Sequence, residues 1–260
     1  MKYLLLLIVW SFFGMHHSFA QEKSAFQEGE WFKFEMSYSG FLKAGNATLE
    51  VEESTYNAKP VYHVIGEGWT SGIISWFFKV RDRYESYFDK VTGSPYRFVR
   101  QIDEGGHTKD VEIEFDHLNN SARVKDNKHN TLETYATDKD VQDMVSAFYY
   151  LRNNYDTDNI KEGDMVSLNM FFDQENYKFR LKFLGRETIR TKFGKIKSLK
   201  FRPYVMAGRV FKEQESLTLW VSADKNKIPL KIKADLAVGS LRANLIAFKG
   251  LRHPFPIQFD

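Results

Sequence analysis

The sequence predicts a mainly β protein, in which one large curled antiparallel sheet, an open or a closed β-barrel, packs around one amphipathic helix. Polar and apolar residues alternate in many short runs, as they do in strands that have one face in water. Turn-forming residues separate these runs. Aromatic residues make up 16% of the chain, and such residues suit the half-buried surface of a sheet.

The N-terminus has the layout of a secretory signal peptide. Lys2 precedes an apolar run over residues 3–13, and the small residues Ser18 and Ala20 then stand where a signal peptidase recognises its substrate. The apolar run is far shorter than the roughly 20 residues of a membrane-spanning helix. We therefore expect cleavage after Ala20, which leaves residues 21–260 as a single β-rich domain without a transmembrane segment.

Cysteine usage and charge exclude several classes of protein. The sequence has no cysteine, so disulfides and thiolate metal sites are ruled out. A lipid-modified start is ruled out as well, because Gln21 occupies the position of the lipid-bearing cysteine. The whole chain has a formal net charge of +3, and Lys2 is the one charged residue before position 21. A mature chain this close to neutral gives no reason to expect a nucleic-acid partner.

Strict alternation predicts several strands along the chain. The clearest runs lie at residues 32–38, 47–52, 111–116, 179–183 and 230–233. Turn chemistry separates the strands at residues 57–60, 92–95, 104–106, 118–120 and 224–227. We interpret Gly105 and Gly106, and also Gly66 and Gly68, as turn or bulge glycines.

Two segments depart from the strand pattern. A helix is predicted over residues 139–153, because apolar residues recur there at helical spacing. Asp138 and Asp140 come just before the apolar run, where acidic residues favour a helix start. The apolar residues at this spacing are Val141, Met144, Val145, Phe148 and Leu151. The other exception is the apolar cluster at residues 72–78, which is expected to form a short helix or a loop.

A weak internal repeat is also present. The runs at residues 28–30 and 162–164 match, as do Pro95 and Pro229, and both pairs are 134 residues apart. Residues 28–136 and 162–260 would then be two half-repeats joined by the helix at 139–153. Identity between these anchor points is no higher than chance, so one unrepeated domain is the alternative.

No motif in the sequence specifies catalysis or metal binding. The histidines of the mature chain are His63, His107, His117, His129 and His253. No two of them have the spacing that would aim two imidazoles at one metal, and the common hydrolase and phosphate-binding motifs are absent. We therefore expect a protein without a cofactor or a metal that is not an enzyme, although a triad assembled from distant positions stays open.

The most informative stretch is the charged strand at residues 79–89. Alternation places Arg81 and Arg83 on one face of this strand and Asp82 on the other. An inward Asp82 needs a partner, because a lone buried carboxylate is costly, and Arg100 on the next strand is the candidate. An apolar loop beside a charged strand is one way to build a site for a hydrophobic ligand.

We predict a ligand site with an apolar gate and a polar edge. The gate residues are Trp69, Ile73, Ile74, Trp76, Phe77 and Phe78, and the edge residues are Arg81, Asp82, Arg83 and Arg100. There is a simpler alternative, in which the charges lie at the rims of an open sheet and the loop plugs the end of a barrel.

Several segments resemble the exported bacterial domain of unknown function 3108 family, and in particular its members from the Bacteroidota. The resemblance covers residues 29–251 and implies a periplasmic location in a double-membraned cell. It implies no activity, and hence no residue roles. The segments that carry it are residues 82–95, 104–106, 147–152 and 219–229. The last segment is also similar, more weakly, to the periplasmic lipoprotein carriers, whose open half-barrel cups acyl chains over a helix.

Two functions from different classes are expected. The first is a non-catalytic periplasmic binding or chaperone-like protein for a lipophilic or envelope-derived ligand. The second is a structural or protein-interaction module in envelope maintenance, with an envelope protein as partner and no ligand cavity. A hydrolase acting on envelope polymers is a third and weaker expectation, since it requires acids that converge in a cleft.

Overall fold

The computed structural model describes residues 24–204, 217–236 and 238–257. The predicted signal peptide lies outside this part of the chain. The strands are β1 (Trp31–Tyr38), β2 (Leu42–Tyr56), β3 (Lys59–Thr70), β4 (Val80–Asp89), β5 (Pro95–Glu104), β6 (His107–Asp116), β7 (Ser121–Asp126), β8 (Thr131–Ala136), β9 (Met165–Phe172), β10 (Glu175–Thr191), β11 (Gly194–Tyr204), β12 (Leu217–Ser222), β13 (Pro229–Asp235) and β14 (Ser240–Lys249). The helices are α1 (Ile74–Phe77) and α2 (Met144–Asn154).

All of these strands join one antiparallel sheet, which confirms the predicted fold class. The strand order is β8-β7-β6-β5-β4-β3-β2-β1-β14-β13-β12-β11-β10-β9. The sheet curls strongly but does not close, because β8 and β9 are its two edges. The five runs of strict alternation lie in β1, β2, β6, β10 and β13.

The glycine predictions were right at one place and wrong at the other. Gly105 and Gly106 form the tight β5–β6 turn with positive φ, a conformation that glycine adopts without steric cost. Gly66 and Gly68 instead lie inside β3, which pairs with β2 and β4 without a register shift. A Cβ atom on Gly68 would meet no atom within 4 Å, so this part of the strand borders open space.

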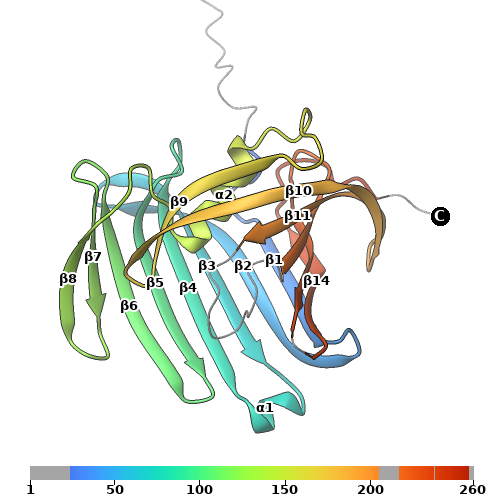
Figure 1. Cartoon of the computed structure of the whole chain (residues 1–260), viewed down its shortest axis with the longest axis horizontal. Coiled ribbons are helices and arrows are strands. Elements are labelled where there is room, and N and C mark those ends of the chain that lie inside the picture. Colours follow the sequence, from blue (N-terminus) through green and yellow to red (C-terminus); the bar gives the residue numbers. More distant parts are fainter. Residues whose placement is uncertain (1–23, 205–216, 237, 258–260) are drawn as a thin grey trace, which may run out of the picture.

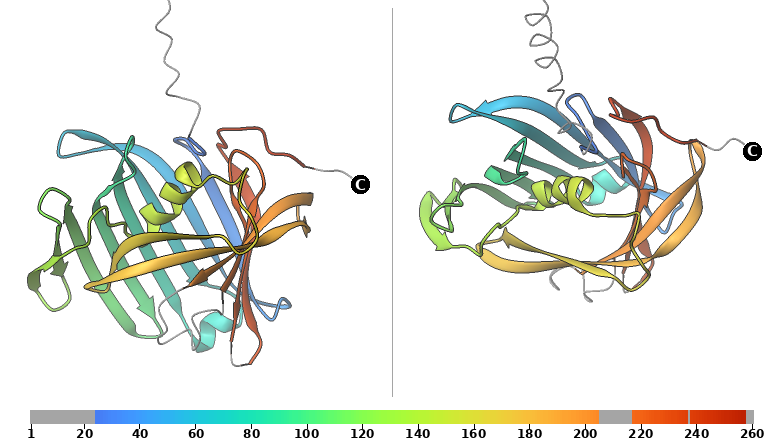
Figure 2. Two further views of the ribbon diagram at one scale, coloured as in Figure 1. Left: turned by 45° about the horizontal axis from the view of Figure 1, so that its top comes forward. Right: turned by 90° about the horizontal axis from the view of Figure 1, so that it is seen from above.

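Helix α2 lies in the hollow of the curled sheet, as the sequence predicted (Figure 2). It contacts β4 on one side and β9 on the other. Ser86 of β4 donates a hydrogen bond of 2.6 Å to Asp143, directly before the helix. Because Ser86 contacts the helix, alternate residues of β4 that share its side of the strand face the concave side of the sheet. Within the described residues, neither helix is of a length and apolarity that would let it cross a bilayer.

The predicted start of α2 at residue 139 was wrong. The helix begins at Met144, and its N-cap is Asp143, whose carboxylate accepts from the backbone N–H groups of Val145 and Ser146. The Ser146 side chain completes a capping box. Before the cap, Lys139 and Asp140 form a turn, in which Asp140 has a positive φ, and Gln142 bridges to Met170 of β9. Neither Asp138 nor Asp140 caps the helix, because the bridge to β9 lies between them and the helix start.

The buried face of α2 also differs from the face that apolar spacing predicted. Met144 is 39% exposed, whereas Ser146 and Arg152 are buried. The complete set of buried residues on the helix is Val145, Ser146, Ala147, Tyr149 and Arg152. Polar residues at these positions require partners inside the core.

Glu30, just before β1, is the partner of Arg152. The guanidinium group of Arg152 donates to both carboxylate oxygens of Glu30, at 2.5 and 2.7 Å, and both side chains are almost fully buried. Arg152 also donates to the backbone carbonyls of Ala25 and Asn226. One side chain thus joins α2 to the N-terminal segment and to the β12–β13 turn.

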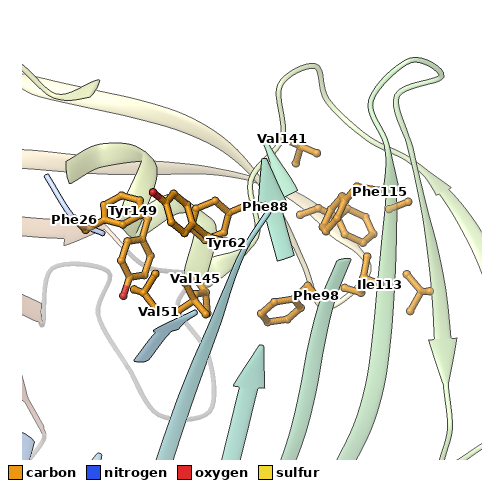
Figure 3. Close-up of a cluster of buried hydrophobic side chains, with 14 of the residues drawn as sticks. Phe26, Val51, Tyr62, Phe88, Phe98, Ile113, Phe115, Val141, Val145 and Tyr149 are labelled. Carbon is orange, nitrogen blue, oxygen red and sulfur yellow. The ribbon is translucent and has the colours of Figure 1, made fainter. Parts of the chain in front are cut away.

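The largest apolar cluster fills the space between α2 and strands β2–β7 (Figure 3). Phe26 packs edge-on against Tyr149 of the helix and Tyr62 of β3, with ring centroids 4.6 and 5.1 Å apart. Phe88 of β4 stacks on Tyr149, with ring centroids 5.7 Å apart, and also lies near Phe26. Two smaller clusters fill the opposite wall, around Phe32 and around Phe201. This core occupies the end of the sheet that holds α2.

Candidate functional site

The charged strand β4 separates the predicted polar edge onto two faces of the sheet, as alternation required. Asp82 shares the concave side with Ser86, and Arg83 faces the convex side. There Arg83 pairs with Glu67 at 2.6 Å and with Glu85 at 2.7 Å. His63 donates from Nε2 to the carboxylate of Glu85 at 2.7 Å.

This convex network looks structural rather than chemical in character. Burial would raise the pKa of Glu85, but hydrogen bonds from Arg83 and His63 hold it below its ordinary value. The His63 ring stacks on Tyr87 at 4.0 Å between centroids. Each of these charged groups therefore has a partner on the sheet surface.

Asp82, unlike the charged groups of the convex network, has a carboxylate oxygen without a partner in the described part of the chain. Its Oδ1 atom is buried and has no hydrogen-bond partner within the described residues. Burial and the nearby charge of Glu104 raise the pKa of Asp82 to about 6. The predicted partner, Arg100, forms its ion pair with Asp173 instead, at 2.5 Å. The register explains this difference, because Ile102 rather than Arg100 lies opposite Asp82.

An open groove of about 1020 Å³ brings four of the predicted residues together. Its lining includes parts of β5 and β6 and the predicted residues Trp69, Arg81, Asp82 and Arg83. Ser75 of α1 also lines this groove. The gate residues Trp76 and Phe77 do not, and they are exposed at the end of the sheet. The remaining predicted edge residue, Arg100, belongs to a second hollow.

That second hollow, which we call the concave pocket, has a volume of about 380 Å³. Its apolar floor comes from the inward side chains of β5, β6 and β7. The β9–β10 turn, with Phe172, Asp173 and Gln174, folds over it. The floor residues are Phe98, Val111, Ile113 and Val124. The volume falls within the range of about 300–1,000 Å³ that small-molecule sites occupy.

Charged side chains stand beside this apolar floor. Arg100 and Lys109 both form ion pairs with the carboxylate of Asp173. The distances are 2.5 Å for Arg100 and 2.8 Å for Lys109. The Arg100 guanidinium group also lies 4.8 Å from the centre of the Phe172 ring, a favourable cation–π contact. Its Nε atom is buried without a hydrogen-bond partner within the described residues. Two cations that share one anion leave positive charge at this site.

Sequence reasoning found Arg100 but missed the rest of the concave pocket. Alternation gave a signal for its floor, because Val111 and Ile113 are inward residues of a predicted strand. Nothing local indicated that the turn at Asp173 would fold over them. That contact joins residues more than 60 positions apart, Lys109 and Asp173.

The described part of the chain offers no cluster of three His, Asp or Glu side chains that could hold a metal ion. The concave pocket, by contrast, combines an apolar floor with hydrogen-bond donors. Such a set of groups can hold a ligand that has an apolar body and an acidic end.

The fold is an open, curled antiparallel sheet that surrounds an internal helix and has a pocket on its concave side. The chain belongs to the family described as "protein of unknown function (DUF3108)", whose model matches residues 33–246. This confirms the family that the sequence resembled. A comparison with curated protein sequences finds no match.

Comparison with solved structures finds several similar chains, and the first described below supports the fold. A β-barrel-like protein of domain of unknown function DUF1849 from Brucella abortus matches with a TM-score of 0.57 and 10% identity, covering 86% of this chain and 98% of that one. A Bacteroides fragilis protein with a YmcC-like fold, proposed to be exported, has a TM-score of 0.30 and 9% identity, covering 86% and 97%. A proposed lipoprotein from Parabacteroides distasonis has a TM-score of 0.31 and 12% identity, covering 87% and 99%.

Proposed function

We propose that this protein is a non-catalytic periplasmic binding protein that holds a lipophilic ligand with an acidic end group in the concave pocket. The observation that carries the proposal is the apolar floor of the pocket beside Arg100 and Lys109, two cations that share Asp173. The apolar part of the ligand would lie on the floor, because burial of apolar surface drives such binding. Its acidic group would take over donors from Asp173.

The location in the periplasm is part of the proposal. It is supported by the signal-peptide layout of residues 1–20. N-terminal sequencing of protein from the native cell should give a mature chain that begins at Gln21.

Delipidated protein titrated with a fluorescent fatty acid tests the proposed ligand class. Val111→Trp should fill the concave pocket and weaken probe binding by at least about tenfold. Leu118→Trp, at an exposed turn outside the pocket, is the matched control and should leave binding unchanged. Lys109→Gln should weaken binding of the acid but not of its neutral methyl ester, because it removes a cationic donor. No uptake, or uptake that Val111→Trp does not reduce, would refute the proposal.

The edge strand β8 favours a second candidate function, a protein-interaction module. All of its residues except Tyr135 are exposed, and no described strand lies beyond it in the sheet. An exposed edge of this kind can pair with a strand from another protein. Native protein that is isolated with a stoichiometric protein partner and without lipid would favour this function over ligand binding.

A further inference from the structure

Several large apolar side chains are exposed at one end of the sheet. Trp76 and Phe77 of α1 are 86% and 81% exposed, and Phe41 of the β1–β2 turn and Val238 of the β13–β14 turn are 83% and 77% exposed. Ile73 and Phe78, on either side of α1, are also exposed. We call these six residues the apolar rim. Exposed apolar side chains that gather in one place mark an interaction surface more often than chance exposure does.

Backbone contacts hold the connections that carry the rim next to one another. Ser71, before α1, donates to the carbonyl of Ala44 in β2 at 3.0 Å. Ser39 of the β1–β2 turn donates to the carbonyl of Ser240 in β14 at 2.6 Å. The Tyr38 hydroxyl donates to the carbonyl of Val238 at 2.9 Å. The connections that carry the rim therefore lie next to one another, at the end of the sheet that lies away from α2 (Figures 1 and 2).

Helix α1 presents its apolar side chains outward. It is a single turn of four residues, none of which is buried. Phe78, directly after it, packs against the β5–β6 turn, where a Cβ atom on Gly105 would lie 2.5 Å from the Phe78 ring. The glycine lets this ring settle on the turn, and Trp76 and Phe77 then project beyond the end of the sheet.

The connections that carry the rim contain several cations. Residues 38–45, 70–81 and 238–243 contain Lys43, Lys79, Arg81 and Arg242. Lys43 is paired with Glu35, and Arg81 lies opposite Asp103 of β5, whose last residue is Glu104. This leaves Lys79 and Arg242 as the cations beside the apolar tips. Basic residues around exposed aromatic ones complement a surface that is anionic outside and apolar beneath.

From this arrangement we infer that the apolar rim docks onto an anionic lipid bilayer. The tips of three separate connections protrude, so each can enter the boundary between headgroups and acyl chains without a shaped partner. Tryptophan and phenylalanine side chains suit this boundary. Lys79 and Arg242 would lie at the level of the headgroups.

The concave pocket reaches the same end of the sheet. Its lining includes His107, the residue after the β5–β6 turn, and Gly105 of that turn donates to the carbonyl of Lys79 at 2.8 Å. Docking would therefore bring the pocket close to the bilayer surface. Ligand transfer by this route rests on the proposed function, whereas docking itself does not.

Vesicle flotation with the mature chain tests the inference. The vesicles are phosphatidylcholine with about one quarter phosphatidylglycerol, because anionic headgroups attract basic residues. The double variant Trp76→Ser/Phe77→Ser should raise the lipid concentration for half-binding by at least about tenfold, because it removes two aromatic side chains from the interface. The control variant Val91→Ser/Leu118→Ser removes two side chains that are each 94% exposed at the opposite end and should bind as the unaltered chain does.

Three further results decide the matter. Trp76 fluorescence should shift to the blue on binding, and Trp76→Phe should bind while losing most of that shift. Pure phosphatidylcholine vesicles should bind more weakly. The inference is overturned if the unaltered chain does not float with vesicles, if the double variant floats equally well, or if the rim instead mediates self-association that the double variant abolishes. Val111→Trp, which blocks the concave pocket, should leave flotation intact, so the two proposals fail separately.

Discussion

At the scale of single residues, Asp82 shows how a strand can put a charge where no donor reaches one of its oxygens. Alternation along β4 predicted that Asp82 would face inward, and this is confirmed. The predicted partner, Arg100, acts on Asp82 through its charge but pairs directly with Asp173 instead, and sequence does not reveal the register between β4 and β5. That register places Ile102 opposite Asp82, and Gly68 on the other neighbouring strand has no side chain to offer.

The raised pKa of Asp82 predicts a pH dependence of stability. Its pKa rises from 3.8 to about 6 on folding, so between these values the folded state binds more protons than the unfolded state. The contribution of Asp82 to the free energy of unfolding therefore falls as pH rises from about 4 to about 6. Asp82→Asn should raise the melting temperature at pH 7.5 and have little effect at pH 3.5.

Thermal unfolding between pH 3.5 and 8 measures this effect. Asp143, whose pKa burial also raises to about 6, should leave part of the slope in the variant. Asp140→Asn is the control, because Asp140 is exposed and its positive φ suits asparagine equally. An Asp82→Asn variant with the same pH slope as the unaltered chain would contradict the expectation.

At the scale of elements, α2 shows what a sequence pattern can and cannot locate. Helical spacing found the helix, since Val145 and Phe148 lie on it. It also included Val141, which is buried in an extended segment before the helix. Asp143 caps the helix together with Ser146, and it also accepts from Ser86, a residue far away in the sequence. A local signal for this start was available, because only Asp143 of the three acids is followed three positions later by a hydroxyl side chain.

The buried pair of Arg152 and Glu30 predicts a specific pattern of stability losses. Glu30→Leu or Arg152→Met should each lower the free energy of unfolding by about 3–5 kcal/mol, because each leaves one charge buried without its counter-charge. The double variant Glu30→Leu/Arg152→Met should lose less than the sum of the two, because it leaves neither charge behind. Urea unfolding measures all three. Additive losses would show that the two side chains stabilise the fold independently.

At the scale of the whole molecule, the sequence predicted one curled sheet around one helix but could not decide whether the sheet closes. The answer depends on contacts between distant segments. The Asn176 side chain of β10 accepts from the backbone of Asp138 and donates to the carbonyl of Ala136. It therefore holds the end of β8 near the opposite edge of the sheet, although no ladder joins β8 to β9.

Removal of this link should loosen the edge of the sheet. Asn176→Ala loses two hydrogen bonds, each contributing about 1 kcal/mol, so the amides of β8 should exchange with solvent at least about fivefold faster. Amides of β3, in the interior of the sheet, should exchange at an unchanged rate. Hydrogen exchange followed by mass spectrometry measures both strands. Equal protection of β8 in the variant would show that other contacts hold this edge.

The pairing of β1 with β14 has a consequence for how the chain acquires its shape. These strands are the first and last in the sequence, yet they are neighbours well inside the sheet. A ribosome or a translocation channel delivers β1 first, and β2–β8 can add to it hairpin by hairpin. The hydrogen-bonding groups on the other edge of β1 stay unpaired until β14 emerges, and during that time they can pair with a wrong strand. A chaperone that shields this edge during synthesis or export would therefore improve the yield of native protein more than one acting on the finished chain.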